Sequence, residues 1–142
     1  MPSLNVDSLN NALENENNAS ILNQTSSKIK NMKNNILQKL QLSGEILKEF
    51  HKKLKYYKYV DELNDINYGC YIRWISLKNP EKIYLTNGGI ICDIKILENG
   101  IHIMVKNNMN RIIQIKLDEN IIFQKLTEQE IIILQALDYL QK

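Results

Sequence analysis

The sequence predicts an α+β protein with a long N-terminal amphipathic helix, a small antiparallel β-barrel of five or six strands and a short C-terminal helix. Three observations predict this fold class. Apolar residues recur at helical spacing between about Ser26 and Tyr57, their period shortens to two between Tyr68 and Lys125, and a capping box precedes an apolar run near the C-terminus. At 142 residues the chain is long enough for one modest core.

Three segments are expected along the chain. The first is predicted to be flexible because "NNALENENNAS" is rich in Asn and Ser and offers too few apolar residues to offset the entropy of ordering. Such an arm could also become ordered on a partner. The segments are a flexible Asn/Ser-rich arm (1–27), an amphipathic helix or kinked helix pair (28–60), and a small β-barrel with a C-terminal helix (61–142).

The amino-acid composition is strongly skewed. The basic residues are sixteen lysines and two arginines, and isoleucine and asparagine together occupy 41 of the 142 positions. Codons rich in adenine and thymine encode Lys, Ile and Asn, so the skew indicates an AT-rich genome. The net charge of +2 is too small to indicate a polyanionic partner. Cys70 and Cys92 lie in apolar runs without other Cys or His at metal spacing, which predicts two reduced, buried thiols.

No targeting or membrane segment is evident in the sequence. The longest apolar runs are too short to span a bilayer, and the first residues lack the basic start and apolar middle of a signal peptide. We therefore expect a soluble, cytoplasmic protein.

The predicted helix carries a narrow apolar stripe that is interrupted at Ser43-Gly44, so a continuous helix and a kinked pair both remain open. A helix of about 30 residues is longer than a small domain can cover. The stripe either folds back on its own domain or pairs with a second copy or another protein, as in a coiled-coil seam. Its residues, which we consider a candidate partner- or oligomer-binding helix, are Ile29, Met32, Ile36, Leu40, Leu47, Phe50 and Leu54.

The segment "HKKLKYYKY" mixes lysines with tyrosines. This mixture is typical of a nucleic-acid surface, because cations pair with phosphates while rings stack on bases. The same residues also suit the last turn of a helix, where cations complement the negative end of the helix dipole. The possible nucleic-acid-binding residues are Lys52, Lys53, Lys55, Tyr56, Tyr57 and Lys58.

The region from Tyr68 to Lys125 contains short Ile-rich runs separated by turn residues, the pattern of an antiparallel meander. Asn87-Gly88 and Asn99-Gly100 provide the positive backbone angles that tight hairpins require. Such a short meander protects its edges best by curling into a small barrel, for which the SH3-like type is the leading candidate. The predicted strands are "CYIRWISL", "KIYL", "GIICDIKIL", "IHIMVK", "RIIQIKL" and "IIFQK".

The first predicted strand contains a tryptophan and one of the two arginines. Alternation places Ile72 and Trp74 on one face, which we assign to the barrel core together with isoleucines of later strands. Arg73 falls on the opposite face among apolar neighbours. We expect its guanidinium to meet a carboxylate such as Asp93 or Glu81, or to stack on a tyrosine, and we retain Arg73 as a possible recognition residue.

The sequence contains no recognisable catalytic arrangement. His51 and His102 are isolated from any nucleophile or metal-ligand pattern, so no catalytic residue, metal site or cofactor is predicted. The segment "TEQEIIILQALDYLQK" begins with a capping box formed by Thr127 and Glu130 and continues as an apolar face. We expect this short helix to close one end of the barrel.

A resemblance to a viral group of proteins rests on three stretches of the chain. "INYGCYIRWISL", followed by "IYLTNGGIICDIKI" and "NIIFQK", resembles a pattern in small uncharacterised proteins of giant nucleocytoplasmic DNA viruses. The shared features are a glycine, a "YIRWI"-type strand and a "GG" before a hydrophobic strand, within residues 61–125. The resemblance implies a viral protein made in the host cytoplasm and packaged in the virion as a minor capsid or core component. It transfers no functional residue.

These observations favour a non-enzymatic protein–protein interaction or assembly protein. Its expected partners are virion or assembly components, and it is expected to be a homo-oligomer. The alternative is a nucleic-acid-binding module that uses the lysine–tyrosine segment.

Overall fold

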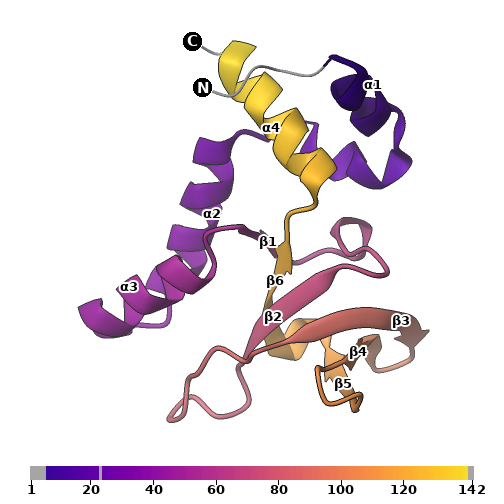
Figure 1. Cartoon of the computed structure of the whole chain (residues 1–142). Coiled ribbons are helices and arrows are strands. Elements are labelled where there is room, and N and C mark those ends of the chain that lie inside the picture. The colour runs from indigo at the N-terminus through magenta and orange to yellow at the C-terminus, as the bar shows by residue number, and fades with distance from the viewer. Residues whose placement is uncertain (1–5, 23, 141–142) are drawn as a thin grey trace. The chain divides into compact units, whose positions relative to one another are not determined.

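The computed structural model describes residues 6–22 and 24–140 and shows an α+β protein with two compact units (Figure 1). We call them the helical unit, which comprises the chain up to His51 and from Leu126, and the sheet unit, Lys52–Lys125. This division differs from the three segments expected from the sequence. The elements are α1 (Val6–Glu14), η1 (Glu16–Ile21), α2 (Ser26–Gln38), α3 (Gly44–Lys53), β1 (Tyr57–Val60), η2 (Leu63–Asp65), β2 (Tyr71–Ser76), β3 (Gly89–Leu97), β4 (Gly100–Lys106), β5 (Ile112–Lys116), η3 (Leu117–Glu119), β6 (Asn120–Lys125) and α4 (Glu128–Leu140).

The helical unit is built around α4. Part of the segment expected to be a flexible arm forms α1 and η1, whose few apolar residues suffice because α4 offers a broad apolar face. The side-chain amides of Asn15 and Asn18 both donate to Gln129 Oε1, over 2.7 and 3.1 Å. The remainder of that expected arm, residues 1–5 and Asn23, lies outside the described residues. The buried cluster consists of Ala12, Ile21, Ile29, Ile133 and Leu134.

The C-terminal helix begins as predicted but lies elsewhere. Thr127 N donates to Glu130 Oε1 and Glu130 N donates to Thr127 Oγ1, each over 3.1 Å, which confirms the capping box. The helix was expected to close a barrel. Instead α4 packs its apolar side on α1, η1 and α2 within the helical unit, as the cluster containing Ile133 and Leu134 shows.

The prediction of one long N-terminal helix, which rested on the apolar stripe, is wrong. The first helix, α1, is short, and the stripe is divided between α2 and α3. Helix α2 begins at an N-cap, where Thr25 Oγ1 accepts from Lys28 N over 3.2 Å. Between the two helices Gln41 adopts a φ of 53°, a left-handed conformation that an α-helix cannot include. Of the two alternatives for the stripe interrupted at Ser43-Gly44, the chain therefore forms the helix pair and not the continuous helix.

The predicted barrel is also wrong, because the six antiparallel strands form one open sheet in the order β1-β6-β2-β3-β4-β5. Closure would require the two edge strands to pair, whereas β1 pairs with β6 and β5 pairs with β4 at opposite ends of the sheet. The predicted "KIYL" strand is part of a loop between β2 and β3. Conversely, β1 forms where the end of the long helix was expected.

One face of the sheet covers the larger core. Trp74 is buried there as predicted, with an exposed fraction of 6%. Gly88 and Gly100 have the predicted positive φ angles, +80° and +129°. Asn99-Gly100 lies in the β3–β4 hairpin as expected, whereas Asn87-Gly88 is at the end of the loop between β2 and β3 and forms no tight hairpin. The buried residues of this cluster are Val60, Ile66, Ile72, Trp74, Ile91, Ile103, Val105, Ile115 and Ile122, with Ile94 and Leu117 packed against them.

Among the described residues, none of the helices combines the length and the apolar character needed to cross a bilayer.

Candidate functional site

The apolar stripe proposed for partner binding is largely part of the folded chain. Ile29, Phe50 and Leu54 are buried, with exposed fractions of 6% or less. Met32 is 40% exposed, and Ile36, Leu40 and Leu47 are half-buried. The stripe is therefore not a free, continuous seam of the coiled-coil kind.

The lysine–tyrosine segment separates into an exposed and an inward part. Lys52, Lys53 and Lys55 are exposed, and Lys55 Nζ lies 5.4 Å from the ring centroid of the exposed Tyr56. Tyr57 is half-buried in β1, where burial raises the pKa of its hydroxyl against a smaller opposing effect of the Arg73 charge.

Lys58 belongs to the inward part of this segment. It has an exposed fraction of only 6%, because strand alternation places it on the same side of β1 as Val60. Its charge acts on Asp65, whose pKa burial raises and Lys58 lowers. Three of the four proposed lysines are therefore exposed, and the fourth is buried.

Arg73 does not make the predicted carboxylate contact. Its Nε donates to the carbonyl oxygen of Thr86 over 2.8 Å. The neighbouring Trp74 N donates to Thr86 Oγ1 over 3.2 Å, and Thr86 N donates to Trp74 O over 3.0 Å. Arg73 therefore fixes the loop before β3 against β2, which is a structural role.

The meander of β3, β4 and β5 forms one end of the sheet (Figure 1). Ile94, Ile103 and Ile115 form a cross-strand row on the core side, so the neighbouring rows point to the opposite face. We call this opposite side the outer face. Its three cross-strand rows are Ile90–Lys106–Ile112, Asp93–Met104–Gln114 and Lys95–His102–Lys116.

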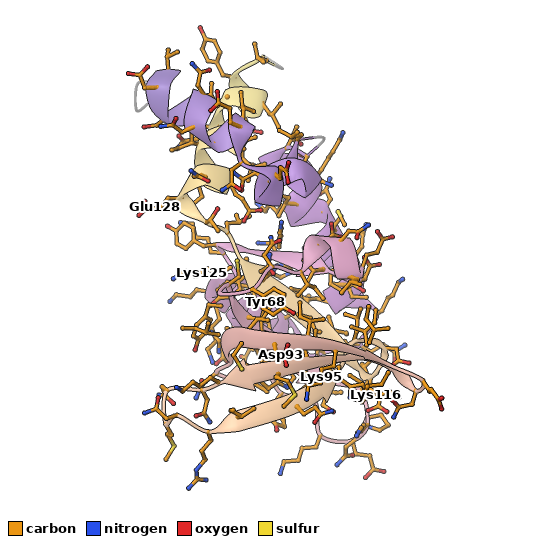
Figure 2. The ribbon with its side chains drawn as sticks, turned by 90° about the vertical axis from the view of Figure 1, so that its right-hand side faces the viewer. Tyr68, Asp93, Lys95, Lys116, Lys125 and Glu128 are labelled. Carbon is orange, nitrogen blue, oxygen red and sulfur yellow. The ribbon has the colours of Figure 1, made fainter. Side chains whose placement is uncertain are left out.

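The outer face is apolar at one end and basic at the other. Ile90 and Ile112 are 48% and 60% exposed, and Met109 in the adjoining turn is 66% exposed. Asp93, Lys95 and Lys116 lie along the remainder of this part of the sheet (Figure 2). Solvent-exposed isoleucines on a pleated sheet are unfavourable unless another surface covers them.

His102 occupies the centre of the basic row and has a structural role. Its Nε2 lies 2.8 Å from Asn99 Oδ1, and its Nδ1 lies 2.8 Å from Gln114 Nε2. An amide nitrogen can only donate, so Nδ1 accepts and Nε2 carries the proton. Both ring nitrogens are thereby satisfied by neutral amides, and the ring is 7% exposed. This arrangement fixes the β3–β4 turn and is poorly suited to proton transfer with a ligand.

The charge of Lys116 is largely compensated. Its Nζ lies 3.7 Å from Glu119 Oε1 and 4.0 Å from Asp118 Oδ1. Glu119 also pairs with Lys78 over 3.0 Å, and this hydrogen bond is the main reason that the pKa of Glu119 lies below its usual value.

The edge of the sheet beside this face is formed by β5. Its five residues pair with β4 in regular register from Ile112 to Lys116, and β5 is the last strand in the sheet order. Within the β3–β4–β5 pairing the register shifts between Ile91 and Asp93 of β3, whereas the β5 ladder is regular and contains no bulge. Ile112 and Ile113 are 60% and 37% exposed. This edge has neither proline nor bulge to prevent another strand from pairing with it.

Sequence reasoning missed this edge because β5 had been placed inside a closed barrel. A usable signal was the adjacent pair Ile112-Ile113. Neighbouring residues of a strand point to opposite faces, so one isoleucine of the pair had to point away from a one-sided core.

The bulge between Ile91 and Asp93 also corrects the expectation of two buried thiols. Cys92 is exposed, with its Sγ donating to Met104 O over 3.3 Å, and Cys70 is half-buried. Neither Cys70 nor Cys92 forms a disulfide. In the part of the chain that the structure describes, no group of His, Cys, Asp and Glu side chains is arranged to hold a metal ion.

Comparisons with known proteins add no functional information: no protein-family model, no curated protein and no solved structure matches the chain.

Proposed function

We propose that the chain is a non-enzymatic protein–protein interaction and assembly protein that works as a homo-oligomer. The observation that carries this proposal is the exposed, unprotected edge strand β5 with Ile112 and Ile113. An open edge presents a row of backbone donors and acceptors, and apolar side chains beside it add a hydrophobic contribution when a second strand pairs there.

The oligomer-binding element in this proposal is the sheet and no longer the helix stripe. Ile29, Phe50 and Leu54 already have their surface buried in the folded chain, so exposing them to a partner would cost stability. By contrast, Ile112 and Met109 are more than half exposed and gain burial only through a partner.

The sequence resemblance within residues 61–125 extends the proposal to a minor capsid or core component of a large DNA virus particle. These residues include the whole of β5 and the outer face. Mass spectrometry of purified particles tests this extension. It is supported if the protein remains with particles after protease treatment of their surface, and it fails if the protein is found only in the host cell lysate.

Sedimentation velocity of the full chain tests the proposed function itself. Between about one and several hundred micromolar, we expect a reversible increase in mass to that of a dimer or larger oligomer, since weak specific interfaces have dissociation constants in this range. A compact monomer at the highest concentration would contradict the proposal.

The second candidate is a nucleic-acid-binding module. It is favoured by the exposed group of Lys52, Lys53 and Lys55 beside the exposed ring of Tyr56. It is weakened by the burial of Lys58 and by the half-buried position of Tyr57. Three lysines and one ring provide a small electrostatic footprint, so we rank this function second.

A further inference from the structure

We propose that two copies of the chain associate by antiparallel pairing of their β5 strands, which joins their two sheets across a two-fold axis at Gln114. This inference rests on the proposed function and specifies which surface performs it.

Strand β5 can pair along its whole length with β5 of a second copy. When Gln114 lies opposite Gln114 of the second copy, all five residues of the strand are paired, because Gln114 is at the centre of Ile112–Lys116. Ile113 then faces Ile115 of the other copy, and Ile112 faces Lys116. In a two-fold arrangement each of these pairs occurs twice, which is the requirement for an isologous interface.

Pairing of the two β5 strands would bring side chains of the two copies together on both faces of the joined sheet. Ile113 and Ile115 lie on the core side of β5, and Ile113 is 37% exposed where the sheet ends. In the joined sheet the Ile115 side chain of the second copy lies beside Ile113, so each core extends across the new boundary. On the outer face, Ile112 lies beside the aliphatic stem of Lys116, which can cover it while the ammonium group remains solvated.

The residues that flank β5 at its two ends carry opposite charges. Arg111 precedes β5 and is exposed, and Asp118 follows it with 71% of its side chain exposed. Because β5 ends at Lys116, Arg111 of one copy lies beside the start of η3 of the second copy, which contains Asp118. Each end of the paired strands thus brings a cation of one copy near an anion of the other. Opposite charges across paired strands stabilise the pairing, whereas like charges oppose it.

Lys116 O on this edge already accepts from Asn120 Nδ2 over 2.8 Å, but β5 contains no proline, bulge or inward-pointing charge. Proteins prevent edge pairing with prolines, bulges or inward-pointing charges. Within β5 the charged residue is Lys116, which points to the outer face and is held by Glu119 over 3.7 Å. The inward positions are both isoleucine. This composition is expected of an edge strand that pairs with another strand.

The first test compares two isoleucine-to-lysine variants by sedimentation equilibrium. Ile113→Lys places a charge on the core side of the edge and is expected to raise the dimer dissociation constant by at least about a hundred-fold, because a buried unpaired charge in an interface costs several kcal/mol. Ile96→Lys is the matched control, since Ile96 is 70% exposed in β3 and away from the edge. It is expected to dimerise like the parent.

The second test determines the register and does not depend on the folding of the lysine variant. In a background in which Cys70 and Cys92 are replaced by serine, Gln114→Cys is expected to form an intermolecular disulfide on mild oxidation. Opposed residues in paired strands have Cα atoms about 4.5 to 5.5 Å apart, within disulfide range. Ile112→Cys is the control. The two copies of residue 112 would be four positions apart along the strands, about 13 Å, and are expected to remain reduced.

The third test exchanges the charges. Arg111→Asp and Asp118→Arg are each expected to raise the dissociation constant on the order of ten-fold, and the double variant to restore it. The outcomes separate the two proposals. A monomeric parent chain overturns both. An oligomer that survives Ile113→Lys, or that cross-links equally through residues 112 and 114, overturns the β5 pairing alone and leaves the assembly function in place.

Discussion

Gly88 lies directly against the main-chain carbonyl of Ile72. A Cβ atom at Gly88 would overlap the Ile72 oxygen and approach Arg73 Cα to 3.1 Å. The same glycine has a φ of +80°, which other residues rarely adopt. Close approach and a left-handed backbone thus coincide where the loop returns to the sheet and β3 begins.

Replacement of Gly88 by alanine is therefore expected to destabilise the fold strongly. The backbone conformation alone costs about 1–2 kcal/mol for a residue with a Cβ, and displacement of β2 adds at least as much. Gly69→Ala is the matched control, because Gly69 also has a φ of +80° but open space around its Cβ position. Urea unfolding of both variants measures the difference. Equal losses would show that contact with Ile72 contributes nothing.

Trp74 provides the largest single side chain of the sheet core. Trp74→Ala is expected to lower the free energy of unfolding by about 3–5 kcal/mol through lost burial and the remaining cavity. Thermal and urea unfolding followed by far-ultraviolet circular dichroism measure the loss. Tyr84→Ala is the control, since Tyr84 is 55% exposed in the nearby loop. A Trp74 variant that melts with the parent would contradict the assignment to the core.

Gln124 connects β6 to the segment before β2. It is fully buried, its Nε2 donates to Asp65 O over 3.1 Å, and its Oε1 accepts from Asn67 N over 3.0 Å. Gln124→Met removes both bonds with little change of shape, and is expected to cost about 1–3 kcal/mol because two part-buried backbone groups lose these partners. Gln135→Met on the exposed side of α4 is the control. Similar unfolding midpoints for the two variants would contradict this role.

His51 is expected to make stability depend on pH. Burial, then the charges of Lys33 and Lys30, place the pKa of His51 below its usual 6.5. Between that lowered pKa and 6.5 the unfolded chain binds more protons than the folded chain, so the free energy of unfolding decreases as the pH falls. His51→Gln should remove this part of the decrease between pH 7.5 and 5.5, as measured by urea unfolding. Lys30→Gln should reduce it, and an unchanged profile for His51→Gln would contradict the assignment.

Substitution of the three exposed lysines tests the nucleic-acid alternative. Changing Lys52, Lys53 and Lys55 to glutamine is expected to leave stability within about 0.5 kcal/mol of the parent, because exposed charges contribute little individually. The measurement is titration with single- and double-stranded DNA at physiological salt, where we expect no sub-micromolar binding by the parent. Such binding with a salt slope near −3, lost in the triple variant, would favour the alternative. Lys58 is left unchanged because its burial would confound the result.

Local patterns in the sequence were sufficient to predict most individual strands. Hairpin β3–β4 follows from alternation on both sides of Asn99-Gly100, and the start of α4 follows from the hydrogen-bonding capacity of Thr127 and Glu130. In each case the interacting residues are close in the chain, so their spacing contains the required information.

The remaining features depend on residues far apart in sequence. Strand β1 was assigned to a helix because the apolar spacing continues through Tyr57, yet the strand exists only through its pairing with β6. Lys58 is buried for the same reason. The open edge could not be predicted either, since six alternating strands are compatible with closed and open sheets. The candidate site on β5 therefore became visible only with the strand order.

The position of β6 between β1 and β2 in the sheet delays completion of the sheet during biosynthesis. Strands β2 to β5 can pair with their neighbours as they leave the ribosome, but β1 and β2 are joined only through β6, the last strand to be translated. Until Phe123 has been added, Tyr59 and Arg73 both lack the strand that lies between them in the finished sheet. Insertion of β6 closes the longest loops of the sheet unit, and such non-local steps are slow. Between the synthesis of β1 and that of β6, the nascent chain thus exposes β1 without its partner strand and leaves one edge of β2 open, and this is the interval in which a chaperone would be needed.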